Sequence, residues 1–488
     1  MATLPPLASS PPRARLLPLS ADAWTLLAIV AASLLLRIWW FGSPVVDHDE
    51  QFYSLVGREM LAGKIPYVDV WDRKPIGLFL IFAAAHALLG ASSAAYLIIA
   101  ELAAVAGAWL VYRLATVLAD ARTARVAALL HVIAMFTYGC RGGQAELFFT
   151  VPCLAMTWLL IRHPGSVRAM AVAMLLGGIA IQIKSSAAPF CLVFGLAVLF
   201  ERWRLMRSWR ALAGEALLYG TLGLAPTLLA VLVYAALGHL DAYLYANFVS
   251  VFDRPVVMGR WSPKTPGVIG PIVLAIASGV WAFFRTGRSY PPRAYAIVAV
   301  TALGTLAGIY ATQNVLAHYY AFLVPWALLL AVPFMDLRAR AGRWGAVMLC
   351  AAFVLASNVP ARLSEMRADR AGFARLAALI GRDGQARGLY VFTGPVELYP
   401  ATGNDGGRYP YPSHHSNQLE MGGLGIAQRT LVEQALARHP AFILARKDYA
   451  EWPDALTVPL VEATLQRDYR PVGTASILGD DLVLYRRR

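Results

Sequence analysis

The sequence predicts a polytopic, all-α membrane protein that carries a small α/β domain at its C-terminal end. Of its 488 residues, 58% are hydrophobic and only 15% are charged, with a mean hydropathy of +0.55, which is too apolar for a soluble protein of this length. The apolar residues form blocks long enough to span a bilayer, which takes about 20 residues per helix. Beyond Asn358 the chain becomes charged and rich in turn residues. These observations predict a membrane domain at 1–360 and an α/β domain outside the membrane at 361–488.

The net charge of +14 is explained by membrane topology and does not indicate a nucleic-acid partner. The arginines stand in short clusters between apolar blocks, as they do in cytoplasmic loops. The four cysteines show no CxxC spacing, so a disulfide framework or a cysteine-based metal site is not expected. Nucleotide-binding glycine motifs are missing from the sequence, which gives no support for ATP-driven chemistry.

Eleven membrane spans are expected. The first block, Trp24 to Phe41, is long for a signal peptide and has no small-residue cleavage site, so we interpret it as an uncleaved span. The later predicted spans are 93–119, 126–140, 145–161, 169–183, 187–200, 212–237, 267–284, 294–311, 319–335 and 344–358. Pro75 to Gly90 is apolar but short for a span, and its assignment depends on the charges of the loops.

The arginine clusters fall on one side of the membrane only if Pro75 to Gly90 does not cross it. The positive-inside rule therefore predicts a helix at the outer interface, a first outer loop at 42–92, a cytoplasmic N-terminus and a periplasmic C-terminal domain. The clusters that decide this are Arg13/Arg15, Arg113/Arg122/Arg125, Arg162/Arg168, Arg202/Arg204/Arg207/Arg210, Arg285/Arg288/Arg293 and Arg338/Arg340/Arg343.

The first outer loop is unusually rich in ionisable residues. Glu50 to Leu61 has the apolar periodicity of a short amphipathic helix, which Gly63 ends. The Lys74-Pro75 step disfavours a helical conformation at Lys74 and lets Pro75 open the next helix. A membrane protein rarely places so many charges in one loop without a function for them.

Three motifs in this loop resemble those of lipid-carrier-dependent glycosyltransferases of the GT-C fold. They are DExxY (Asp49, Glu50, Tyr53), REMLAG (Arg58 to Gly63) and KPI (Lys74 to Ile76). The resemblance is greatest to the branch that holds the protein O-mannosyltransferases and the lipid A aminoarabinose transferases. It implies a bacterial inner-membrane enzyme that moves a sugar from a polyprenyl-phosphate carrier to a lipid, glycan or protein acceptor in contact with membrane lipids.

The resemblance implies catalytic carboxylates at Asp49 and Glu50, with Asp49 as the base that activates the acceptor. Partial burial is expected to raise the pKa of Asp49 toward neutral pH, while nearby cations limit the rise. Inverting single displacement follows from attack opposite the departing phosphate. The alternative is that Asp47, Asp49 and Glu50 form a solvated cluster at the start of a helix.

Two cations are candidates for binding the donor phosphate. Lys74 matches the basic residue of the family's KPP or KPI motif, although this chain has Ile76 where relatives often have a second proline. Arg58 lies about two helical turns beyond the DExxY motif. It could contact the phosphate or form an ion pair with Glu59 or Asp72.

Further polar residues are expected to face a substrate cavity at the outer ends of the spans. A charge at such a depth usually faces a cavity or a partner, although Lys184 could instead extend to the interface, and His318 could have a structural role. The predicted cavity residues are Asp47, His48, Tyr53, Arg141, Glu146, Lys184, His318 and Tyr319. Arg254, Arg260 and Lys264, in a later outer loop with many aromatic residues, could bind an anionic head group or belong to an interfacial belt.

No cofactor is obligatory in this interpretation, but a divalent metal is possible. Asp47, His48 and Asp49 have metal-binding side chains, yet adjacent residues seldom point the same way. Two other interpretations are a transporter of a lipid-linked sugar and an inactive partner subunit. A transporter is expected to place its binding groups near the bilayer midplane and to show inverted repeats, whereas these charges gather at one face and no repeat is visible.

The C-terminal domain has the pattern of alternating helices and strands, with a final hairpin around Gly479 and Asp480. Gly403 to Gly425 has no periodicity and is expected to be a long loop. The predicted elements are helices at Phe373 to Ile380, Leu431 to Arg438 and Val461 to Arg467, and strands at Leu389 to Thr393, Ala441 to Ala445, Val472 to Leu478 and Leu482 to Tyr485.

Overall fold

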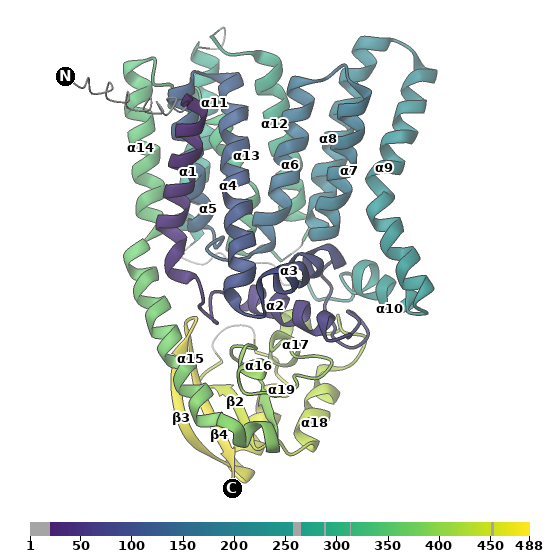
Figure 1. Cartoon of the computed structure of the whole chain (residues 1–488), viewed down its shortest axis with the longest axis vertical. Helices are drawn as coiled ribbons and strands as arrows, with labels where there is room; N and C mark the ends of the chain where they lie inside the picture. Colours follow the sequence, from purple (N-terminus) through teal and green to yellow (C-terminus); the bar gives the residue numbers. More distant parts are fainter. Residues whose placement is uncertain (1–19, 257–264, 287–288, 313, 450–452) are drawn as a thin grey trace, which may run out of the picture.

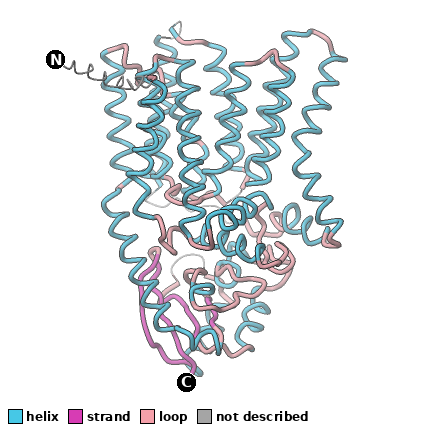
Figure 2. The backbone as a smooth tube through the Cα atoms, viewed as in Figure 1, coloured by secondary structure: helices cyan, strands magenta, loops and turns pink. Residues whose placement is uncertain are grey.

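The computed structural model describes residues 20–256, 265–286, 289–312, 314–449 and 453–488. A bundle of long helices forms one part of the molecule, and a small sheet with its own helices lies at one end of that bundle (Figure 1). All strands are confined to this second part (Figure 2). Arg260 and Lys264, predicted as possible lipid ligands, lie outside the described residues.

Eight stretches of helix in the described part of the chain are long and apolar enough to cross a membrane. Shorter helices run beside them and supply the other predicted spans (Figure 1); these are α5 (Ala121–Thr137), α7 (Val167–Ile183) and α13 (Val324–Leu330), which follows η5 (Ala317–Phe322). The longer elements are α1 (Ala21–Arg37), α4 (Ser93–Leu118), α6 (Ala145–Arg162), α8 (Ala188–Met206), α9 (Trp209–Ala236), α11 (Thr265–Thr286), α12 (Pro292–Tyr310) and α14 (Arg340–Ser357).

The segment after Lys74 forms a helix that does not run through the bundle, as predicted. This helix, α3 (Ile76–Leu89), packs against α2 (His48–Leu61) at the end of the bundle that faces the C-terminal part (Figure 1). The short helix α10 (Leu240–Leu244) lies at the same end. The loops that join α4 to α5, α6 to α7 and α8 to α9 lie at the opposite end, and the arginine clusters lie in the ends of the helices beside them. This arrangement agrees with the parity argument.

The C-terminal part is joined to the bundle by an almost uninterrupted helix. After α14, Asn358 adopts a left-handed conformation (φ 44°), and α15 (Val359–Arg387) continues away from the bundle. The sequence pattern predicted a helix only from Phe373, because the residues before it lack a clear apolar stripe. Arg370 stabilises this earlier part by donating to the carbonyl oxygen of Phe41, 2.8 Å away, just after α1.

Four strands form one mixed sheet in the order β1-β2-β4-β3. The parallel strands are β1 (Leu389–Val391) and β2 (Phe442–Arg446), and an antiparallel hairpin of β3 (Tyr469–Ile477) and β4 (Asp480–Arg487) completes the sheet. These strands lie where the sequence predicted them.

Alternation of buried side chains lets the sheet pack on both faces. Leu389 and Leu444 join the core that includes α15, whereas Tyr390 and Ile443 join a second core. This second core contains α18 (Gln428–Ala437) and α19 (Thr457–Asp468). The segment predicted as a long loop, 403–425, contains only short helical turns, α17 (Ser413–Ser416) and η6 (Gln418–Glu420), and follows the similar turn α16 (Leu398–Ala401).

Candidate active site

Helix α2 places Asp49 at the boundary between the bundle and the C-terminal part. Asp47 has an extended backbone, and its side chain accepts a hydrogen bond from the Asp49 N–H at 3.3 Å, which is the geometry of a helix N-cap. Asp49 and Glu50 then occupy the first turn, where the helix dipole favours negative charge.

Asp49 is surrounded by donors and cations from distant parts of the chain. The Tyr411 hydroxyl donates to Asp49 Oδ1 at 2.7 Å, and His318 Nε2 lies 3.9 Å from Asp49 Oδ2. Burial raises the pKa of Asp49, but the charges of Lys74 and His318 and the hydrogen bond from Tyr411 outweigh it and lower the pKa to about 2. The expected rise in the pKa of Asp49 was therefore wrong, because more positive groups face this carboxylate than the sequence revealed.

Lys74 is the cation with the greatest electrostatic effect on Asp49. Its backbone is fixed by the Tyr67 hydroxyl, which donates to the Lys74 carbonyl oxygen at 2.8 Å. Its ammonium group lies 5.5 Å from the centre of the Tyr53 ring and 3.8 Å from Asp72 Oδ2. Because the Asp72 contact is too long for a hydrogen bond, the ammonium retains donors for a phosphate.

The remaining members of the cluster come from the ends of the spans. Glu146, in the first turn of α6, forms a buried ion pair with Lys184, the residue that ends α7. The Lys184 ammonium lies 4.1 Å from the centre of the Tyr319 ring, and the His318 ring packs edge-on against that tyrosine with centroids 4.6 Å apart. We call the set Asp49, Tyr53, Lys74, Glu146, Lys184, His318, Tyr319 and Tyr411 the Asp49 cluster.

Glu50 contacts a different set of residues. Its carboxyl group is completely buried and accepts a hydrogen bond from the Gly143 N–H in the loop between α5 and α6. Burial and the charge of Asp47 raise the pKa of Glu50 to about 8, against the opposing effects of the Gly143 N–H, Arg37 and Arg141. Glu50 therefore contacts the loop before α6, and its predicted catalytic role stays a prediction.

Arg37 and Glu50 both form hydrogen bonds with the loop between α5 and α6. Arg37, at the end of α1, donates to the carbonyl oxygens of Cys140 at 2.8 Å and Gly142 at 2.9 Å. A Cβ atom at Gly142 would overlap the Glu50 carboxylate, so the close approach requires glycine. Arg141 also lies in this loop and interacts electrostatically with Glu50. The loop leads directly into α6 and so fixes the start of the helix that carries Glu146.

Arg58 and His48 interact with the C-terminal part of the chain. The Arg58 Nη2 lies 2.8 Å from both carboxylate oxygens of Glu397, which replaces the Glu59 or Asp72 partner considered from the sequence. His48 Nε2 lies 3.9 Å from Asp480 Oδ2. Arg58 thus fastens α2 to the C-terminal part, and its predicted phosphate contact stays a prediction.

Asp47, His48 and Asp49 do not converge as a metal site. Asp47 caps α2, His48 faces Asp480, and Asp49 faces Tyr411 and His318. Among the residues that the structure describes, no three histidine, cysteine, aspartate or glutamate side chains gather as possible metal ligands. The residues present do not fit the metal that the sequence left open.

Residues in and beside the Asp49 cluster were missed from the sequence. Tyr411 is one, and Glu420 is another, since its carboxylate pairs with Arg73 and lies 2.8 Å from Arg254 Nη2. Arg254 also donates to the Leu419 carbonyl oxygen at 3.0 Å. The one signal for Tyr411 was the aromatic and histidine-rich run at 409–415 within an otherwise irregular segment.

Comparisons with known proteins agree with this architecture. The family model described as Dolichyl-phosphate-mannose-protein mannosyltransferase matches residues 73–238. The crystal structure of ArnT from Cupriavidus metallidurans bound to undecaprenyl phosphate is 14% identical, with a TM-score of 0.62 over 96% of this chain and 98% of that chain.

The archaeal oligosaccharyltransferase AglB from Archaeoglobus fulgidus, in complex with an inhibitory peptide and a dolichol-phosphate, is 12% identical. Its TM-score is 0.50, and the match covers 87% of this chain and 69% of that chain. No curated protein matches the sequence. The long helices, the helices across one end of the bundle and the structural matches together identify the chain as a membrane protein with the GT-C fold of these glycosyltransferases.

Proposed function

We propose that this protein transfers a sugar from a polyprenyl-phosphate carrier to a lipid, glycan or protein acceptor at the periplasmic face of a bacterial inner membrane. The observation that carries the proposal is the Asp49 cluster, in which the Asp49 carboxylate lies in the positive field of Lys74, His318 and Lys184 at the end of the bundle. The family match and the bound lipid phosphates of the two similar structures support it.

The reaction that suits this cluster is an inverting single displacement. An acceptor hydroxyl or amine attacks the anomeric carbon and passes its proton to Asp49, while the bond from that carbon to the phosphate oxygen breaks. The bond's electron pair stays on the departing phosphate, where Lys74 stabilises the developing negative charge. Because the donor phosphate offsets the positive field of Lys74, the pKa of Asp49 rises when the donor binds, and the carboxylate becomes a stronger base.

The orientation is supported by the loops of the bundle. Arginine clusters gather at the end away from the C-terminal part, which the positive-inside rule assigns to the cytoplasm. The Asp49 cluster then faces the periplasm. No nucleotide is needed there, since the lipid phosphate itself supplies the activated leaving group.

Substituting Asp49→Asn tests the proposal with purified protein in lipid nanodiscs and a panel of synthetic short-chain polyprenyl-phosphate sugars. Loss of a general base costs about 10²- to 10⁴-fold in turnover. Asp47→Asn is the matched control, because asparagine caps a helix as well as aspartate does, and it should retain most of the activity. An Asp49→Asn enzyme that keeps more than about a tenth of the wild-type rate would exclude Asp49 as the base.

A further inference from the structure

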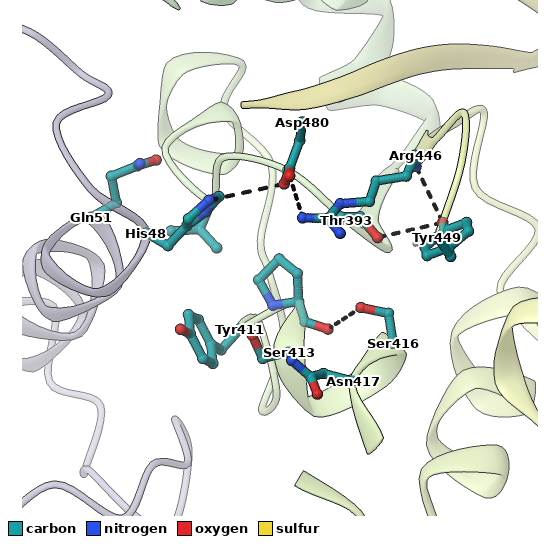
Figure 3. A pocket seen from close by; sticks show the side chains of 13 residues that line it. His48, Gln51, Thr393, Tyr411, Ser413, Ser416, Asn417, Arg446, Tyr449 and Asp480 are labelled. Carbon is teal, nitrogen blue, oxygen red and sulfur yellow. Dashed lines mark hydrogen bonds and ion pairs between the residues drawn. The ribbon is translucent and has the colours of Figure 1, made fainter. Parts of the chain in front are cut away.

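A cavity of ≈ 200 Å³ lies between α2 and the edge of the C-terminal sheet (Figure 3). Its walls include His48 and Gln51 from α2, Thr393 just after β1, Arg446 at the end of β2 and Asp480 at the start of β4. This is the edge formed by the carboxyl ends of the parallel strands, where open α/β sheets bind their ligands.

The charged groups that line the cavity are paired with one another. Arg446 forms an ion pair with Asp480, and His48 approaches the same aspartate from the opposite wall (Figure 3). The Tyr449 hydroxyl accepts hydrogen bonds from the Arg446 N–H at 3.1 Å and from the Thr393 hydroxyl at 3.4 Å. The lining therefore has little excess charge and offers many hydrogen-bonding groups.

Two buried polar atoms of the lining have no hydrogen-bond partner within the described ranges. One is the Gln51 amide oxygen, on a side chain whose nitrogen donates to the Asp47 carbonyl oxygen at 2.8 Å. The other is Arg446 Nε. Both atoms are shielded from solvent in this conformation, so a ligand in the cavity meets other polar groups of the lining. Ser413, Ser416 and Asn417 also line the cavity, and their hydroxyl and amide groups suit a ligand that both donates and accepts hydrogen bonds.

The cavity is connected to the Asp49 cluster through Tyr411. The side chain of Tyr411 lines the cavity, and its hydroxyl donates to Asp49 Oδ1 at 2.7 Å. His48 lines the cavity too and precedes Asp49 in α2. A group held in the cavity is thus one side chain away from the carboxylate that deprotonates the acceptor.

We propose that this cavity binds a neutral carbohydrate group of the acceptor and so orients the acceptor for attack; this inference rests on the proposed transferase function. Hydroxyl groups of a sugar match the hydroxyl and amide side chains of Ser413, Ser416 and Asn417, and the lining residues Tyr411 and Tyr449 offer aromatic rings to a sugar ring. The small volume suits one ring better than an extended peptide, and the pairing of Arg446 with Asp480 disfavours an anionic group.

Saturation-transfer NMR tests the binding directly, with the full-length protein in lipid nanodiscs. The probes are the methyl glycosides of mannose, glucose and galactose, with a serine- and threonine-containing peptide as the competing class. We expect saturation transfer to at least one glycoside for the wild type, and a reduction of at least fivefold for Ser413→Phe, which fills the cavity, and for Arg446→Ala.

Arg467→Ala is the matched control, because Arg467 forms an exposed ion pair with Asp468 outside the cavity lining. It should behave as the wild type, and thermal unfolding should verify that all variants are folded. The proposal is overturned if no glycoside shows saturation transfer, if the peptide alone does, or if both cavity variants bind glycoside as the wild type does.

A transfer assay separates this inference from the proposed function. In a wild type that transfers sugar to a glycan acceptor, the cavity variants should raise the KM for the acceptor at least tenfold and leave the KM for the donor unchanged. Wild-type transfer with an unaltered acceptor KM in the variants contradicts the cavity assignment alone. Glycoside binding by a wild type that transfers no sugar to any acceptor contradicts the transferase function.

Discussion

The buried carboxyl group of Glu50 offers a quantitative test of how α2 is held in place. Glu50→Gln replaces a carboxyl group that is largely protonated at neutral pH with a neutral group of nearly the same shape. The glutamine carbonyl can accept the hydrogen bond from the Gly143 N–H that Glu50 accepts now. We expect the variant to fold, and to lose a pH dependence of stability that the wild type has.

The size of this effect follows from the two pKa values of Glu50. The pKa is about 8 in the folded protein and 4.5 as the ordinary value. Between these values the folded protein holds a proton that the unfolded chain has lost. The contribution of Glu50 to the free energy of unfolding is therefore most favourable below about pH 4.5, and it declines by about 1.4 kcal/mol per pH unit as the pH rises toward 8. From pH 5 to 8 the free energy of unfolding of Glu50→Gln should rise relative to that of the wild type by about 4 kcal/mol.

Thermal unfolding in lipid nanodiscs from pH 5 to pH 9 measures this difference. The melting temperature of the wild type should fall relative to that of Glu50→Gln, and the gap should stop growing above about pH 8. Glu433→Gln is the control, since Glu433 lies on the exposed side of α18 in an ion pair with Arg429. If the melting temperatures of Glu50→Gln and the wild type change in parallel across this range, the Glu50 carboxyl group is not held protonated in the folded protein.

Three further predictions concern the cluster and the orientation of the chain. Lys74→Ala should lower both donor affinity and turnover, and Lys74→Arg should restore only part of each, because a guanidinium directs its hydrogen-bond donors differently from an ammonium group. Steady-state kinetics with a short-chain donor measures both quantities. Unchanged turnover in Lys74→Ala would show that Lys74 is not a phosphate ligand. Tyr411→Phe keeps the ring packing on Phe52 but removes the hydrogen bond that lowers the pKa of Asp49. The acidic limb of the pH profile of kcat/KM should therefore move to higher pH by about 1 to 2 units. A profile that does not move would contradict this contact. A reporter fused after Asn358 should be active in the periplasm and one near Arg204 in the cytoplasm, and the reverse pair would overturn the orientation.

The bundle was largely predictable from the sequence, because hydropathy and charge are local signals. The short length of Pro75 to Gly90 and the sidedness of the arginines sufficed to exclude α3 as a span. The same parity argument placed Glu146, Lys184 and His318 at one end of the bundle. The structure brings His318 and Lys184 close to Asp49 and pairs Glu146 with Lys184.

Contacts between the two parts of the chain could not be predicted in this way. Arg58 and Glu397 are separated by 339 positions, and Asp49 and Tyr411 by 362. Periodicity indicates which residues share a face of one element but does not say which face of another element meets it. The predicted direction of the pKa shift of Asp49 was wrong for the same reason, because the shift depends on a tyrosine and on cations that only the fold brings together.

The separation between Asp49 and Tyr411 also determines when the site can form during synthesis. At about 5 to 20 residues per second, the ribosome needs on the order of tens of seconds to make the intervening chain. During that time α2 and its partners Lys74, Gly143 and His318 have already been made, while Glu397 and Tyr411 are still missing. A chain released before residue 411 contains all the predicted spans yet lacks the hydroxyl that contacts Asp49. Assembly of the site therefore has to wait until the C-terminal part has been made.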